Sequence, residues 1–141
     1  MSDLTWFIYA LLDALFAALA TIFAKMGLSK VDPVVATGLR SIVMMLFTVS
    51  LMLLIRDKAL ISSLTSREIL FIILSGVAGA LSWLLYFVAL QYGKAVNVAV
   101  VDRSSILFII ILAALILGEE ITLKKGIAAI LVLIALILIS T

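Results

Sequence analysis

Five long runs of apolar residues follow one another along the chain, and short polar segments separate them. A bilayer core of about 30 Å requires roughly 20 apolar residues in a helix, and each run meets or approaches that length. The pattern therefore predicts transmembrane helices over residues 4–24, 34–55, 69–90, 95–117 and 124–140. Short connections predict that consecutive helices are antiparallel neighbours within one domain, residues 1–141.

The composition agrees with this pattern. Hydrophobic residues make up 67% of the 141-residue chain and charged residues only 13%, against about 25% charged in a typical soluble domain. A soluble fold of this size has too little interior to bury so much apolar surface. We therefore predict an all-α, polytopic membrane protein whose partner is the lipid bilayer. The net charge of +2 gives no indication of nucleic-acid binding.

Residue types that carry much of enzyme chemistry are missing from the sequence. It contains no Cys and no His, which removes thiolate nucleophiles, Cys/His metal sites and the imidazole base. There is also no G-x-x-x-x-G-K-[ST] phosphate-binding motif. We expect no enzyme activity, no cofactor and no metal site.

Basic residues at the predicted helix ends indicate the orientation in the membrane. Five lie on the side of the N-terminus and three on the opposite side, a slight bias that favours a cytoplasmic N-terminus. The five are Arg56, Lys58, Arg67, Lys124 and Lys125, and the three are Lys25, Lys30 and Lys94. So small a bias also permits insertion in both orientations.

Four charged residues lie well inside predicted helices: Asp13, Arg40, Asp102 and Arg103. Each costs about 2.5–3.5 kcal/mol at a helix centre, so paired or solvated positions are expected. Arg40 and Asp102 are about 9 and 10 Å from the same membrane surface, and we predict that they pair. Asp13, near the midplane, is a candidate proton or substrate acceptor. The set predicts a water-accessible cavity, and the alternative is that these residues only fix helix packing.

Two helix faces add candidate site residues. In the first helix Asp13, Ala17, Thr21 and Lys25 recur at every fourth position, which predicts a seam of small residues that also lines a cavity. In the third helix Trp83 and Tyr86 lie one turn apart. Their rings are candidates for the wall of a site for an apolar, aromatic or cationic ligand.

Several short motifs occur in a characteristic order. They are AKMGL at residues 24–28, ATGLRS at 36–41, GALSWLLYF at 79–87, VDRSS at 101–105 and LGEEIT at 117–122. Together they resemble the EamA-type repeat of the drug/metabolite transporter superfamily, and in particular its short, five-helix bacterial and archaeal branch. The resemblance covers nearly the whole chain and rests on the order and spacing of the motifs.

The resemblance implies one five-helix repeat, half of a ten-helix transporter, in the plasma membrane of a bacterium or archaeon. An odd number of helices per repeat makes a second copy inverted, so a lone five-helix chain would rebuild the ten-helix architecture as an antiparallel homodimer. A parallel homodimer and a monomer are the alternatives. Arg103 replaces the Lys usual in that branch, and the Pro that many ten-helix members have near Ser104 is absent. Asp13 is unusual at its position, and the helix-1 Glu of related four-helix exporters aligns nearer Ala17.

These observations predict a secondary-transporter subunit that moves a small metabolite or amphipathic solute by alternating access. The candidate substrate or coupling residues are Asp13, Thr21, Lys25, Arg40, Trp83, Tyr86, Asp102 and Arg103. The alternative is a non-transporting membrane scaffold or assembly partner, in which the polar residues only fix helix packing.

Overall fold

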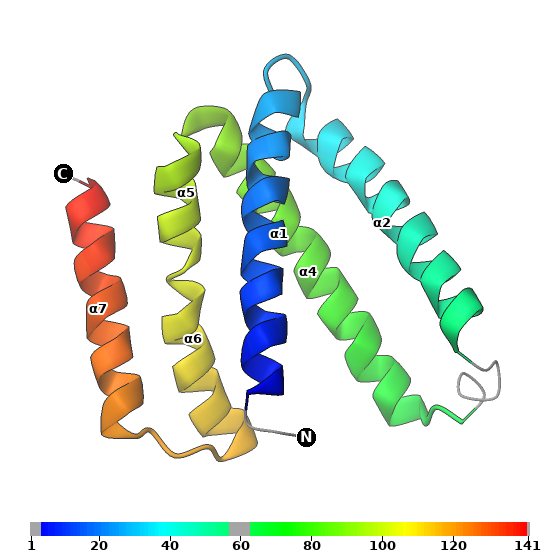
Figure 1. Cartoon of the computed structure of the whole chain (residues 1–141). Helices are drawn as coiled ribbons and strands as arrows, with labels where there is room; N and C mark the ends of the chain where they lie inside the picture. The colour runs from blue at the N-terminus through cyan, green and yellow to red at the C-terminus, as the bar shows by residue number, and fades with distance from the viewer. Residues whose placement is uncertain (1–3, 57–62, 141) are drawn as a thin grey trace. The chain divides into compact units, whose positions relative to one another are not determined.

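The computed structural model describes residues 4–56 and 63–140, and its regular structure within these ranges is helical. The elements are α1 (Thr5–Gly27), α2 (Pro33–Ile55), α4 (Ser66–Tyr92), α5 (Ala95–Asp102), α6 (Ser105–Leu112), η1 (Ala113–Leu117) and α7 (Leu123–Ser140) (Figure 1). Lys58, one of the basic residues that sets the predicted orientation, lies outside the described residues.

Four stretches of helix are long and apolar enough to cross a membrane: α1, α2, α4 and the stretch from Ala95 to Leu117. The fifth helix, α7, has 18 residues. Large apolar side chains are exposed on these helices, for example Leu54 at 83% and Leu115 at 77%. Such exposure is costly in water but not in lipid. Within the described residues, the structure thus confirms the all-helical prediction, with four stretches that are able to span a membrane.

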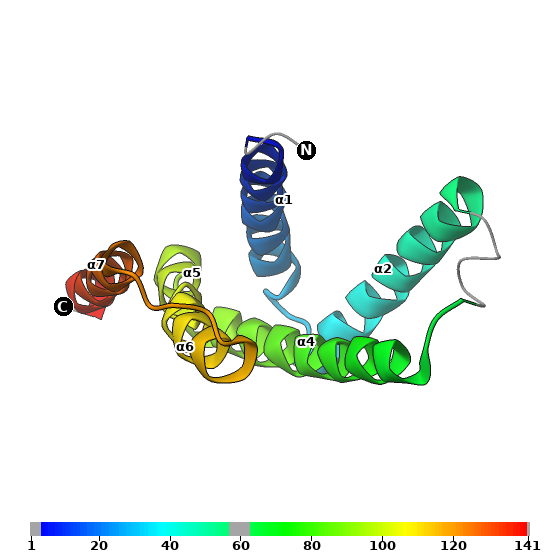
Figure 2. The same ribbon diagram turned by 90° about the horizontal axis from the view of Figure 1, so that it is seen from below.

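The chain forms two compact units, Phe23–Tyr92 and a second one that joins Met1–Ile22 to Gly93–Thr141. In the unit Phe23–Tyr92, α2 and α4 are antiparallel neighbours that lie closest where α2 begins and α4 ends (Figures 1 and 2). The buried residues gather at that end: Leu28, Pro33, Thr37, Phe87 and Leu90. This small core fixes the register of the two helices.

Local capping starts α2 at the same end. Asp32 Oδ1 accepts hydrogen bonds from the backbone N–H groups of Val34 (2.8 Å) and Val35 (3.3 Å), while Pro33 occupies the first helical position. An acidic N-cap followed by Pro is a favourable start, because the cap satisfies free donors and Pro needs none. The sequence Asp32-Pro33 therefore determines where α2 begins.

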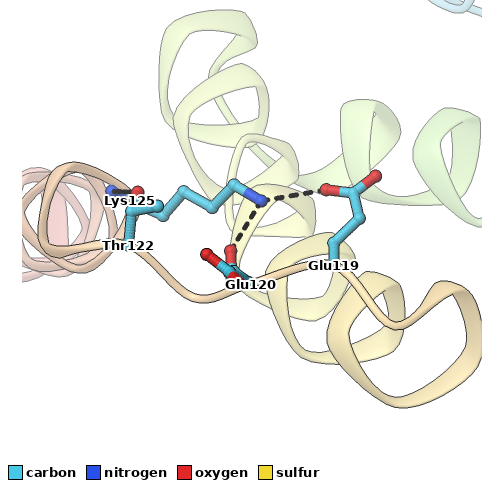
Figure 3. Close-up of polar contacts among 4 residues, drawn as sticks. All are labelled: Glu119, Glu120, Thr122 and Lys125. Atoms are coloured by element: carbon cyan, nitrogen blue, oxygen red, sulfur yellow. Dashed lines mark hydrogen bonds and ion pairs between the residues drawn. The ribbon is translucent and has the colours of Figure 1, made fainter.

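In the other unit α7 packs against α5 and α6 and runs antiparallel to them (Figure 1). The connection turns at Gly118, whose φ of 69° lies in the left-handed region that favours glycine. Lys125 Nζ then binds the connection, at 2.9 Å from both Glu119 Oε2 and the Glu120 carbonyl oxygen (Figure 3). The charged residues after Gly118 thus form an exposed, ion-paired turn.

The predicted helix over residues 95–117 is not continuous. It is interrupted between Asp102 and Ser105, where Ile106 and Leu107 donate their N–H groups to the carbonyls three residues earlier instead of four. Five-residue π-helical geometry follows at η1. The interruption contains no proline. It consists of a turn at Arg103 and Ser104 in which the hydrogen bonds span three residues, as in a 3₁₀-helix.

Candidate functional site

Arg40 is the centre of the candidate site in the unit Phe23–Tyr92. It lies on α2, is half-buried, and its guanidinium carbon is 3.4 Å from the centroid of the Trp83 ring on α4. The Phe87 ring centroid is 5.7 Å away. Stacking of this kind contributes about 0.5–2 kcal/mol, less than the roughly 2.5–3.5 kcal/mol that an arginine costs inside a membrane. Stacking on the rings alone therefore does not offset the free-energy cost of placing the Arg40 charge in the membrane.

The rings beneath Arg40 form one cluster along α4. Trp83 meets Tyr86 with ring centroids 5.5 Å apart and Phe87 with centroids 6.2 Å apart, both nearly edge to face. These residues follow one another at three- and four-residue spacing, which brings side chains together on one helix face. We call Trp83, Tyr86 and Phe87 the aromatic wall.

Thr37 lies three residues before Arg40 on α2 and differs from Ser41 and Thr48 of that helix. Ser41 and Thr48 donate to the carbonyls four residues earlier, at 2.8 and 2.7 Å. Thr37 is only 8% exposed, yet its Oγ1 has no hydrogen-bond partner among the described residues. A buried unsatisfied hydroxyl costs about 1–3 kcal/mol, so Thr37 next to Arg40 is a candidate for hydrogen bonding to a ligand.

Lys25, at the end of α1, belongs to the same unit. Its Nζ donates to the carbonyl oxygen of Leu90 at 2.5 Å, in the last turn of α4. Carbonyls at a helix C-terminus lack partners within the helix and attract cations. Lys25 therefore holds the end of α1 to the end of α4 beside the buried core.

A groove in the other unit contains two further predicted residues, Thr21 and Arg103. It has a volume of about 330 Å³ and lies between α1 and α5. It is lined mainly by small and branched apolar residues: Ala14, Ala17, Ala18, Ile22, Ala95, Val96, Ala99 and Val100. Thr21 Oγ1 donates to the Ala17 carbonyl at 2.9 Å. Of the predicted stripe, Ala17 and Thr21 line this groove, and Asp13 and Lys25 do not.

The remaining predicted residues, Asp13 and Asp102, have exposed side chains, as does Arg103. Asp102 is the last residue of α5, immediately before the interruption of the helix. The predicted pair of Arg40 with Asp102 connects residues of two different units and stays a prediction. The role of Asp13 as a proton or substrate acceptor also stays a prediction.

Two members of the cluster around Arg40 are not among the residues predicted from the sequence. Phe87 follows Trp83 by four positions and Thr37 precedes Arg40 by three, so helical spacing was the available signal for both. Neither residue type indicates a site in an apolar helix, because Phe ordinarily packs against neighbouring helices or lipid and the Thr hydroxyl ordinarily donates to the backbone of its own helix.

Comparison with known proteins agrees with these features. The model of the EamA-like transporter family matches residues 4–141. A protein of a Sinorhizobium species, described as an uncharacterized transporter in the cobO 3' region, is 37% identical over 121 residues, which are 86% of this chain and 86% of that protein. No solved structure matches the chain. With a family match over nearly its full length, the chain belongs to the EamA-like transporter family.

Proposed function

We propose that this protein is a non-enzymatic subunit of a secondary transporter, which moves a small metabolite or amphipathic solute across the plasma membrane by alternating access. The observation that carries the proposal is the cluster of Arg40 with the aromatic wall, inside a helix that is apolar and long enough to span the membrane. Ionisable residues at such positions mark solute pathways in membrane proteins by default. The family match supports the same function.

The interruption of the fourth predicted helix supports the alternating-access part of the proposal. Broken spanning helices recur in secondary transporters, where the freed backbone groups serve the solute pathway. Here the interruption falls at Arg103 and Ser104, next to the groove between α1 and α5. Arg103 and Ser104 keep helical dihedral angles and hydrogen-bonded N–H groups there, and we propose that this locally tightened turn is where the spanning helix bends during alternating access.

The test of transport is solute flux in proteoliposomes, with and without a pH gradient. We expect saturable uptake of at least one solute from a broad panel of metabolites, lipids and organic ions, above the rate in protein-free vesicles. The absence of flux across the whole panel, with correctly inserted protein, would contradict the proposal.

One double substitution separates transport from the scaffold alternative. In Arg40→Met with Asp102→Leu, a scaffold whose polar residues only fix packing would lose stability, and neither the parent nor the variant would show flux. A transporter should lose flux while it still inserts into the membrane. Flux and thermal unfolding of the same preparation distinguish the two functions.

We further propose that two copies form a homodimer. An odd number of spanning helices makes two paired repeats inverted, so two copies inserted in opposite orientations would reproduce the paired architecture. Because the chain has no Cys, Ser29→Cys and Ser63→Cys, in connections at opposite ends of α2, are clean labelling sites. An antiparallel dimer predicts that an impermeant maleimide labels each site from both sides. Labelling of each site from one side only would contradict the antiparallel arrangement.

A further inference from the structure

We propose that the solute carries an oxyanion, a carboxylate or a phosphate-type group, on an apolar body. Arg40 and Thr37 bind the oxyanion, and the aromatic wall of Trp83, Tyr86 and Phe87 contacts the apolar body. The inference rests on the proposed transport function and names the chemical class of its substrate.

Arg40 has the geometry of an oxyanion ligand-binding group. One face of its guanidinium covers the Trp83 ring at 3.4 Å, which leaves the N–H groups at the edge of the plane for hydrogen bonding. Within the described residues of its own unit, Arg40 has no ion pair or hydrogen bond. A guanidinium presents its donors in a planar fork that matches the two oxygens of a carboxylate or phosphate. A stacked arginine with its edge available is therefore suited to an oxyanion.

Thr37 offers a second donor independently of Arg40. Its buried hydroxyl has no partner among the described residues, whereas the hydroxyls of Ser41 and Thr48 on the same helix bond to the backbone. Thr37 and Arg40 are three residues apart, so they share one face of α2. A hydroxyl and a guanidinium on one face provide donors for two oxygens of one ligand.

A cation is disfavoured as the natural ligand of the aromatic wall. Arg40 already covers the ring face of Trp83 that a cation would use. Lys25 lies at the same end of the unit, at Leu90. The carboxylate at that end, Asp32, is engaged by the first backbone N–H groups of α2. A second cation would therefore meet repulsion, and an anion would meet attraction.

The emission of Trp83 provides a direct test, because the chain has only two tryptophans and the other, Trp6, is 67% exposed near the start of α1. Trp6→Phe leaves Trp83 as the single fluorophore next to Arg40. The purified protein in a neutral sugar-based detergent is titrated with four probes of similar size. These are benzoate, phenylphosphonate, neutral benzamide and cationic benzylammonium.

We expect benzoate and phenylphosphonate to change the Trp83 emission saturably, and benzamide and benzylammonium to bind at least tenfold more weakly. Thr37→Val should weaken the binding of both anions about tenfold, which is the effect of losing one hydrogen bond to a charged group. Arg40→Met should abolish the saturable response, and Arg40→Lys, which keeps the charge but not the planar fork, should restore only part of it. Thr48→Val and Arg67→Met are matched controls on exposed positions and should change nothing.

Several results would overturn the inference. One is equal binding of benzoate and benzamide, and another is preferential binding of benzylammonium. A third is an anion response that persists unchanged in both Arg40→Met and Thr37→Val. A response to added phosphatidylglycerol without any response to the soluble anions would show that the oxyanion is a lipid headgroup, and the substrate assignment would then be wrong.

The flux assay separates this inference from the transport function itself. Saturable flux of neutral or cationic solutes, with no flux of organic anions, would leave the transporter proposal intact and overturn the substrate class. Anion binding at Trp83 without flux of any solute would contradict transport while it confirms the oxyanion site.

Discussion

The two arginines inside the spanning stretches, Arg40 and Arg103, occupy very different surroundings. Arg40 lies on a continuous helix, half-buried against an aromatic ring and three residues from a buried hydroxyl without a partner. Arg103 is exposed at an interruption of its helix, beside a groove lined by alanines and valines. The first region has a buried hydroxyl without a partner among the described residues, and the second has mostly apolar walls.

The difference indicates a division of roles between the two regions. Unsatisfied donors next to rigid aromatic rings are features of a binding site, because a ligand there recovers hydrogen bonds and buries apolar surface. Small apolar residues along a groove allow close packing of helices in lipid, and a helix break allows movement. We therefore propose that the region of Arg40 recognises the solute and that the region of Arg103 serves packing and movement.

The largest effect on stability is expected at the ring beneath Arg40. Trp83→Ala removes the stacking partner of the guanidinium and the contacts with Tyr86 and Phe87, at a cost of about 2–3 kcal/mol. Trp83→Phe keeps a ring and should cost less than half of that. Unfolding in mixed micelles measures both, with Trp6→Ala at an exposed site as the control. Equal stability of Trp83→Ala and Trp6→Ala would refute the stacking argument.

Two lysines provide the next comparison. Lys25 is half-buried and donates to the Leu90 carbonyl, so Lys25→Met should cost about 1.5–3 kcal/mol, the range for hydrogen bonds to charged groups. Lys125 makes an exposed ion pair with Glu119, and Lys125→Met should cost about 0.2–1 kcal/mol, less at high salt. Thermal unfolding at two salt concentrations measures both losses of stability. A larger loss for Lys125→Met than for Lys25→Met would contradict the prediction.

Two glycines give opposite predictions for the same substitution. Gly118→Ala places a side chain at φ 69° and should cost about 1 kcal/mol, because the left-handed region is unfavourable for residues with a Cβ. Gly76 lies inside α4 with nothing within 4 Å of an added Cβ. Gly76→Ala should be neutral or stabilise by up to about 1 kcal/mol. If Gly76→Ala instead lowers the stability measured by unfolding, another helix must contact that face closely, for example a helix of a second copy.

The smallest effect is predicted for the groove in the region of Arg103. Ala99→Leu adds apolar volume where the groove has open space, and we expect the affinity of benzoate measured at Trp83 to change by less than about twofold, below 0.5 kcal/mol. A tenfold loss of affinity would mean that the groove, and not the region of Arg40, contributes to recognition.

Much of the architecture follows from hydropathy, because runs of about 20 apolar residues have few alternatives to spanning helices. Asp32-Pro33 likewise specifies the start of α2. The interruption at Arg103 was not predictable, because no proline or glycine marks it and the changed hydrogen bonds leave no trace in the composition. The family resemblance from short motifs in order is confirmed.

The candidate site was predictable only in part. Arg40, Trp83 and Tyr86 were each identified from charge or ring type, yet their contact depends on the register of α2 against α4, which hydropathy does not encode. Thr37 was not identified, because a threonine in an apolar helix ordinarily bonds to its own backbone, as Thr21 and Thr48 do. Its missing partner is visible only in three dimensions.

The most direct test of the division of roles compares Arg40→Met with Arg103→Met in proteoliposome flux of an aromatic carboxylate such as benzoate. Both variants remove one charge from a spanning stretch, and each is reconstituted at the same level and checked for insertion. We predict that Arg40→Met lowers the initial rate at subsaturating solute at least tenfold, which corresponds to about 1.4 kcal/mol or more. Arg103→Met should stay within about threefold of the parent. Equal losses in the two variants, or a larger loss in Arg103→Met, would contradict the account.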